Sequence, residues 1–129
     1  MLWQQATFIT YTSATIIAGS LAGLIWYLFP NGVKRPKLLT PRFLSQKILS
    51  RIYKYDHDTN GLPSGHVFYS VVTTYFLAQA YPQIAAVLWI LTIAIIISAV
   101  TTKQHYLADV LGSLVVASSA IVLALTFVS

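Results

Sequence analysis

Hydrophobic and polar positions follow one another in long blocks along this chain of 129 residues. Four apolar segments can be marked, at about residues 6–29, 64–81, 84–102 and 106–128. Each has roughly the length that a helix needs to cross ~30 Å of hydrocarbon. The segment 64–81 is the least apolar of the four, so we expect it to be buried among the others. The pattern therefore predicts a bundle of about four membrane helices.

The longest polar stretch, residues 30–63, contains an amphipathic pattern. Thr40 followed by Pro41 is typical of an N-cap and a first helical position. Apolar residues then recur at helical spacing, and cations occupy the opposite face: Phe43, Leu44, Ile48, Leu49, Ile52 and Tyr53 against Arg42, Lys47, Arg51 and Lys54. This predicts a basic helix lying in the lipid headgroup region, with a solvated linker helix as the alternative.

Composition supports a membrane location. The chain is 57% hydrophobic and 9% charged, which is more apolar surface than a soluble domain of this length could bury. We therefore expect one all-α transmembrane domain over residues 1–129, with the four membrane helices and one interfacial helix. The absence of cysteine excludes disulfides and thiolate metal sites. The net charge of +5 points to anionic membrane lipids as partners, not to nucleic acid. The N-terminus has no basic region or clear cleavage site, so we expect the first apolar segment to stay in the membrane.

Three polar groups, far apart in sequence, are expected at one end of this bundle. They are Lys34-Arg35-Pro36, Pro63-Ser64-Gly65-His66, and the group Lys103, His105 and Asp109. Four crossings with short connections place all three on the same side of the membrane. Each group alone has an ordinary explanation: an interfacial anchor, a helix cap and a structural ion pair, respectively.

Together these groups have the residue types needed for phosphoryl transfer. His105 and Asp109 are four residues apart, so on a helix they would share a face and the carboxylate could orient the imidazole. Pro63-Ser64-Gly65 at a helix start offers N–H groups and a hydroxyl to a phosphate. Two histidines, free helix-end N–H groups and several cations describe phosphoryl transfer without a metal or another cofactor.

These motifs resemble those of the type 2 phosphatidic acid phosphatase superfamily. The matching residues are Arg35-Pro36, Pro63-Ser64-Gly65-His66, and Ser98 leading to His105 and Asp109. The resemblance implies that His105 is a nucleophile forming a phosphohistidine, that Asp109 orients it, and that His66 protonates the leaving oxygen. It also implies that Arg35, Ser64 and Gly65 bind the phosphate, and that no metal takes part.

The sequence departs from the family pattern at two cations. The arginine of the third motif falls on Ala99, and the first-motif lysine falls on Leu28. Lys103 and Lys34 are the nearest replacements. The sequence Thr101-Thr102-Lys103-Gln104-His105-Tyr106 resembles the branch that includes inositol-phosphorylceramide synthases. Members typically have six membrane helices against four here, which is typical of a minimal member or a fragment lacking N-terminal helices.

We therefore expect an integral membrane lipid phosphatase acting on a phospholipid or a prenyl diphosphate. The alternatives are a lipid headgroup phosphotransferase with the same site and a non-catalytic membrane protein that binds anionic lipid. Two arguments conflict over orientation. All eight lysines and arginines lie on the motif side, which the positive-inside rule would place in the cytoplasm. The resemblance implies an extracytoplasmic site, which we expect at the cell membrane. We favour this orientation because several of these cations have phosphate to bind.

Overall fold

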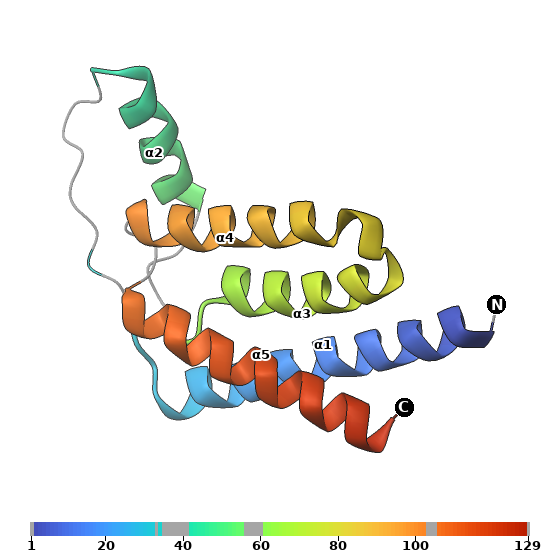
Figure 1. Ribbon diagram of the computed structural model, residues 1–129. Coiled ribbons are helices and arrows are strands. Elements are labelled where there is room, and N and C mark those ends of the chain that lie inside the picture. The colour runs from blue at the N-terminus through green and yellow to red at the C-terminus, as the bar shows by residue number, and fades with distance from the viewer. Residues whose placement is uncertain (1, 33, 35–41, 56–60, 103–105, 129) are drawn as a thin grey trace.

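The computed structural model describes residues 2–32, 34, 42–55, 61–102 and 106–128. In these ranges α1 (Leu2–Leu28), α3 (Gly65–Ala80), α4 (Ala85–Thr101) and α5 (Leu107–Phe127) form a bundle. The short 3-10 helix η1 (Pro82–Ile84) connects α3 to α4, and α2 (Leu44–Tyr55) lies beyond the other end of the bundle (Figure 1). The all-α fold predicted from the hydrophobic pattern is confirmed.

Helix α3 is the central element, because it packs against α1, α4 and α5. Its buried apolar side chains belong to one core together with a row of small residues on α1, where Ala14, Ala18 and Ala22 are completely buried. Alanine at every fourth position lets helix backbones approach closely. The rest of the core comes from α3 and α5, and includes Val67, Phe68, Val72, Phe76, Ala117, Ala120 and Ala124. The expected burial of the least apolar segment is therefore confirmed.

Among the described residues, three of the four expected membrane helices are long and apolar enough to cross a membrane: Gln5–Leu28, Pro82–Thr101 and Leu107–Phe127. With 16 residues, α3 is shorter and extends over only ~24 Å. The outer surface of α4 is apolar as well, with Ile90, Ile93 and Ile97 more than half exposed. Apolar residues outside and a polar central helix inside are what a lipid environment requires.

The amphipathic helix starts later than the sequence suggested. Thr40 and Pro41 lie outside the described residues, and α2 begins at Leu44, so the prediction of a helix from Pro41 onward was wrong. The side chain of Gln46 explains the start. Its Oε1 accepts hydrogen bonds from the N–H groups of Arg42, at 2.8 Å, and Phe43, at 3.3 Å. A glutamine at the third helical position that reaches back in this way caps a helix N-terminus.

Both chain ends lie at the end of the bundle that carries η1 (Figure 1). The opposite end brings together the end of α1, the start of α3, the end of α4 and the start of α5 (Figure 1). The three predicted motifs fall at these positions of the chain.

Candidate active site

The turn that leads into α3 is held by the end of α1. The Asn31 side chain pairs with the backbone of Leu62 in both directions. Its Nδ2 donates to the Leu62 carbonyl at 3.1 Å, and its Oδ1 accepts from the Leu62 N–H at 2.7 Å. The Trp26 Nε1 donates to the carbonyl of Pro63 at 3.2 Å. These bonds fix the Pro-Ser-Gly-His motif relative to the residues that precede Lys34.

Helix α5 holds the same turn from the other side. The hydroxyl of Ser113 accepts a hydrogen bond from the backbone N–H of Ser64 at 2.7 Å. It donates to the carbonyl of Asp109 at 2.6 Å and also lies 3.1 Å from the carbonyl of Ser64. Ser113 is completely buried, so water cannot replace these bonds. One side chain therefore connects the second motif to the third.

Gly112 makes this close approach of α5 possible. A Cβ atom at this position would lie 2.6 Å from the Cδ1 of Leu62, well inside van der Waals contact. Any larger residue would force the Leu62 side chain to move. Gly112 and Ser113 thus act together, the first by leaving room and the second by hydrogen bonding.

The N-terminus of α3 is built as expected for a ligand-binding helix end. Ser64 is its N-cap residue, yet the Ser64 side chain makes no capping hydrogen bond. Its Oγ is buried and has no hydrogen-bond partner among the described residues. A Cβ added to Gly65 would meet nothing within 4 Å among them. Leaving a buried hydroxyl unsatisfied costs ~1–3 kcal/mol. An anionic ligand at this positive helix end could supply the missing acceptor.

Asp109 lies at the start of α5 and is almost completely buried. Its Oδ2 accepts a hydrogen bond from the Tyr106 N–H at 2.8 Å, and its own N–H donates to the Tyr106 carbonyl at 3.0 Å. The carboxylate therefore caps the helix, in addition to any role toward a histidine. A negative charge in the first turn also interacts favourably with the helix dipole.

Helix α5 starts within one residue of the predicted position. The helix begins at Leu107, and Tyr106 has extended backbone angles of φ −87° and ψ 163°. The described helix therefore starts after Tyr106, and the prediction that His105 and Asp109 share one helical face stays a prediction. His105 itself lies outside the described residues. Helix α5 starts at this point because the Asp109 carboxylate binds the N–H group of Tyr106, which in a longer helix would bond to a backbone carbonyl.

Lys34 connects the first motif to the third. Its backbone N–H donates a hydrogen bond to the hydroxyl of Tyr106 at 3.1 Å, and the residue is exposed. The chain segment next to Arg35 is thereby held beside the residue that follows His105. Described parts of all three motifs thus lie at one end of the bundle, as the spacing of the segments predicted.

His66 is exposed and borders two grooves. The first, of about 720 Å³, lies between His66 and one face of α2. The second, of about 450 Å³, lies between His66 and α4, where Ser98 and Ala99 line it. Ala99 is the position at which the third-motif arginine is missing. The groove wall next to His66 therefore carries a methyl group where a cation was expected.

The structure brings together five of the predicted site residues, namely Lys34, Ser64, Gly65, His66 and Asp109. The other three, Arg35, Lys103 and His105, lie outside the described residues. Sequence reasoning missed the residues that fix the site: Trp26, Asn31 and Ser113. Ser113 had a signal, since it is a polar residue in an apolar helix, four positions after Asp109. Asn31 had no such signal, because an asparagine directly after an apolar segment is common.

These features define a helical bundle with a polar site at one end and, among its described residues, three helices long and apolar enough to cross a membrane. The model of the PAP2 superfamily matches residues 7–129, so the chain belongs to that superfamily. The resemblance seen in the motifs is thereby confirmed, and phosphatases or related phosphotransferases are the activities of this group. No curated protein and no solved structure matches the chain. Its place in the inositol-phosphorylceramide-synthase-like branch stays a prediction.

Proposed function

We propose that this chain is an integral membrane lipid phosphatase that hydrolyses a phosphomonoester or diphosphate of a lipid without a metal. One observation carries the proposal. The Ser113 hydroxyl joins the backbone of Ser64, at the start of α3, to that of Asp109, at the start of α5. A phosphate-binding helix end and a carboxylate suited to orient a histidine are thereby held next to each other.

The reaction has two steps in this proposal. A ring nitrogen of His105 attacks phosphorus, the bond from phosphorus to the lipid oxygen breaks, and that oxygen takes a proton from His66. Asp109 orients His105 and stabilises its positive charge. A water molecule then gives a proton to the neutral His66 and attacks the phosphohistidine. The nitrogen–phosphorus bond breaks, and inorganic phosphate leaves.

The phosphate is bound by the N-terminus of α3 and by cations. Gly65 leaves open space beside the first N–H groups of the helix, and the buried Ser64 hydroxyl has its hydrogen-bonding capacity unused among the described residues. Arg35, Lys34 and Lys103 supply positive charge for the equatorial oxygens. Preorganised donors of this kind are the main source of rate acceleration in phosphoryl transfer.

Two further parts of the proposal concern the acceptor and the orientation. The Thr-Thr-Lys-Gln-His-Tyr sequence favours a headgroup phosphotransferase as the second candidate, in which a lipid alcohol takes the place of water.

We place the site on the extracytoplasmic face of the cell membrane. A cysteine-labelling experiment with a membrane-impermeant reagent at an introduced Lys54→Cys would determine the side, because the chain has no native cysteine.

The test is phosphate release by the purified full chain in detergent, with EDTA present. Short-chain phosphatidate and a prenyl diphosphate are the substrates, and His105→Ala is the negative control. We expect release by the wild type and none by the variant. A phosphorylated protein that is stable to alkali and labile to acid would identify the phosphohistidine. A folded protein that releases no phosphate and transfers none to an added alcohol would contradict the proposal and favour a lipid-binding role.

A further inference from the structure

Helix α2 is joined by a hydrogen bond to the end of the bundle that carries the candidate site. The hydroxyl of Tyr53 donates a hydrogen bond to the carbonyl of Thr102 at 2.6 Å, so α2 is tied to the end of α4. Thr102 is the last described residue before the third motif. The hydrogen bond from Tyr53 to Thr102 therefore helps to position α2 next to the candidate site.

The face of α2 that borders the groove carries two of its cations. The groove of about 720 Å³ is lined by His66 and by six residues of α2, which are Leu44, Lys47, Ile48, Arg51, Ile52 and Tyr55. These six recur at intervals of three and four, so they form one helical face. The expectation that Lys47 and Arg51 lie on the face opposite the apolar residues of this helix was therefore wrong. Among the described residues no carboxylate lines the groove. A cationic surface therefore faces the same space as His66.

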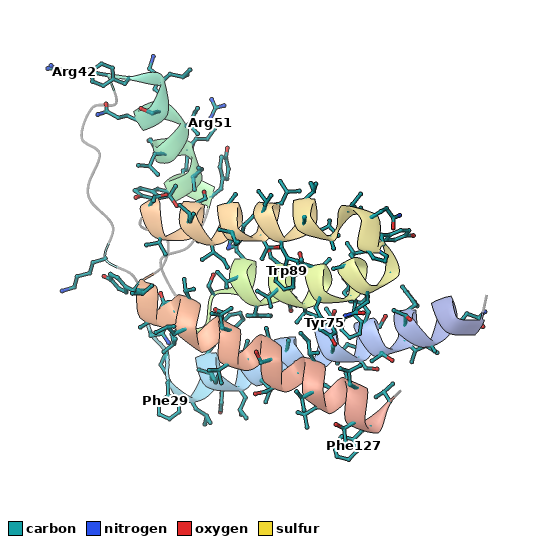
Figure 2. The ribbon with its side chains drawn as sticks, in the orientation of Figure 1. Phe29, Arg42, Arg51, Tyr75, Trp89 and Phe127 are labelled. Carbon is teal, nitrogen blue, oxygen red and sulfur yellow. The ribbon has the colours of Figure 1, made fainter. Side chains whose placement is uncertain are left out.

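The two other cations of this region have different positions. Lys54 does not line the groove, and its Nζ lies 5.9 Å from the centre of the Tyr55 ring. Arg42 precedes α2 and lies at the far end of this helix from the bundle, whereas Arg51 lies nearer the bundle (Figure 2). Simple attraction to anionic headgroups would use all four cations alike. The groove singles out Lys47 and Arg51.

We propose that Lys47 and Arg51 form a second anion-binding site, which holds the inner phosphate of a lipid diphosphate. This inference rests on the proposed function. When the outer phosphoryl group is transferred to His105, the bond from its phosphorus to the bridging oxygen breaks. The bridging oxygen keeps the electron pair, stays on the inner phosphate and receives the proton of His66. The leaving group is then a lipid monophosphate, whose charge must be bound next to His66.

Lys47 and Arg51 meet this need by position and chemistry. They border the groove that His66 borders, and they come from an element that the reacting phosphate does not contact in the proposal. A guanidinium can bind two phosphate oxygens at once, and an ammonium adds a point charge. The apolar side chains of Ile48 and Ile52 in the same face suit the first carbons of the lipid tail. A lipid monophosphate has no second phosphate for Lys47 and Arg51 to bind.

The decisive experiment compares a prenyl diphosphate and a prenyl monophosphate with the same tail. The double variant Lys47→Gln/Arg51→Gln is measured against the matched control Arg42→Gln/Lys54→Gln, which removes the same charge outside the groove. We expect the groove variant to lose about tenfold or more in kcat/KM for the diphosphate and to lose little for the monophosphate. The control variant should behave as wild type with both. Equal losses for the two substrates, or equal losses in the two variants, would overturn the proposal.

A binding measurement separates this inference from the proposed function. Titration calorimetry of the full chain in detergent, with EDTA, gives the affinity for each lipid without turnover. If no lipid is hydrolysed but the groove variant alone loses its preference for the diphosphate, the phosphatase proposal fails and the second site stands. If hydrolysis occurs and the groove variant binds both lipids as the control does, the second site is wrong and the phosphatase proposal stands.

Discussion

Ser113 on α5 accepts a hydrogen bond from the backbone N–H of Ser64, the N-cap residue of α3, at 2.7 Å. The two residues are 49 positions apart in sequence, and both are completely buried. The hydroxyl that accepts this bond also donates to the carbonyl of Asp109. Two motifs recognisable in the sequence are thus positioned by a third residue that neither of them contains.

Ser113→Ala should therefore reduce both stability and activity. It leaves the buried N–H of Ser64 without an acceptor, which costs ~1–3 kcal/mol. The start of α3 is also released from Asp109, so turnover should fall further than the population of folded protein does. Thermal unfolding in detergent and initial rates at a temperature well below unfolding separate the two effects. Ser119→Ala, an exposed serine on the same helix, is the matched control. A variant with wild-type turnover would show that Ser113 serves stability alone.

Asp109→Asn should separate capping from catalysis. The amide oxygen of asparagine can still accept the hydrogen bond from Tyr106, so the start of α5 should persist with a modest change in unfolding temperature. The negative charge is lost, and with it the stabilisation of a positively charged histidine, so turnover should fall by ~10²-fold or more. Asp109→Ala should lose both properties. Similar rates for wild type and Asp109→Asn would assign this residue to capping only.

The glycines on the two sides of the junction should respond in opposite ways to alanine. At Gly65 a methyl group meets nothing within 4 Å among the described residues, so Gly65→Ala should keep or slightly raise stability. It should weaken inhibition by vanadate, because the methyl group occupies the space beside the helix-end N–H groups. Gly112→Ala places its Cβ against Leu62 and should lower the unfolding temperature. Unchanged vanadate affinity in Gly65→Ala would remove this helix end from the phosphate site.

His66→Ala should depend on the leaving group. Loss of a general acid typically costs ~10²–10⁴-fold, but only where the leaving oxygen needs a proton. With p-nitrophenyl phosphate, whose leaving group is stable as an anion, the loss should be much smaller than with a lipid alcohol. Rates of both substrates with wild type and variant provide the comparison. Equal losses for the two would mean that His66 contributes to binding, without proton transfer.

The fold was largely predictable because long apolar segments have few alternatives in lipid. The segments ending near Phe29 and Thr102, for example, were located to within a residue or two of the observed helix ends. The start of α2 was not predicted correctly. There Gln46, at the third helical position, determines the start by accepting hydrogen bonds from the N–H groups of Arg42 and Phe43. Side-chain caps of this kind depend on geometry that hydrophobic periodicity does not record.

The reactive residues of the candidate site were predictable from the sequence, but the residues that position them were not. His66 and Asp109 carry side chains whose chemistry and spacing are visible in the sequence. Asn31 and Trp26 act by binding the backbone of Leu62 and Pro63, and a backbone partner leaves no trace in the identity of the residue that it serves. Lys47 and Arg51 were read as headgroup contacts, since only the placement of α2 shows that they border the groove of His66.

Lys103→Gln tests how the chain replaces the cation absent at Ala99. Ala99 is buried and lines the groove beside His66, so this part of α4 contributes no charge there. Lys103, two residues before His105, is the candidate replacement. As a phosphate ligand it should tolerate Arg but not Gln, and Lys103→Gln should lower turnover at least about tenfold, or ~1.4 kcal/mol. Inhibition by vanadate, which mimics the transferring phosphoryl group, should weaken in parallel. A lysine that only anchors the chain at the interface would tolerate either change. Unchanged turnover and vanadate affinity in Lys103→Gln, as expected for the control Lys54→Gln, would identify such an anchor.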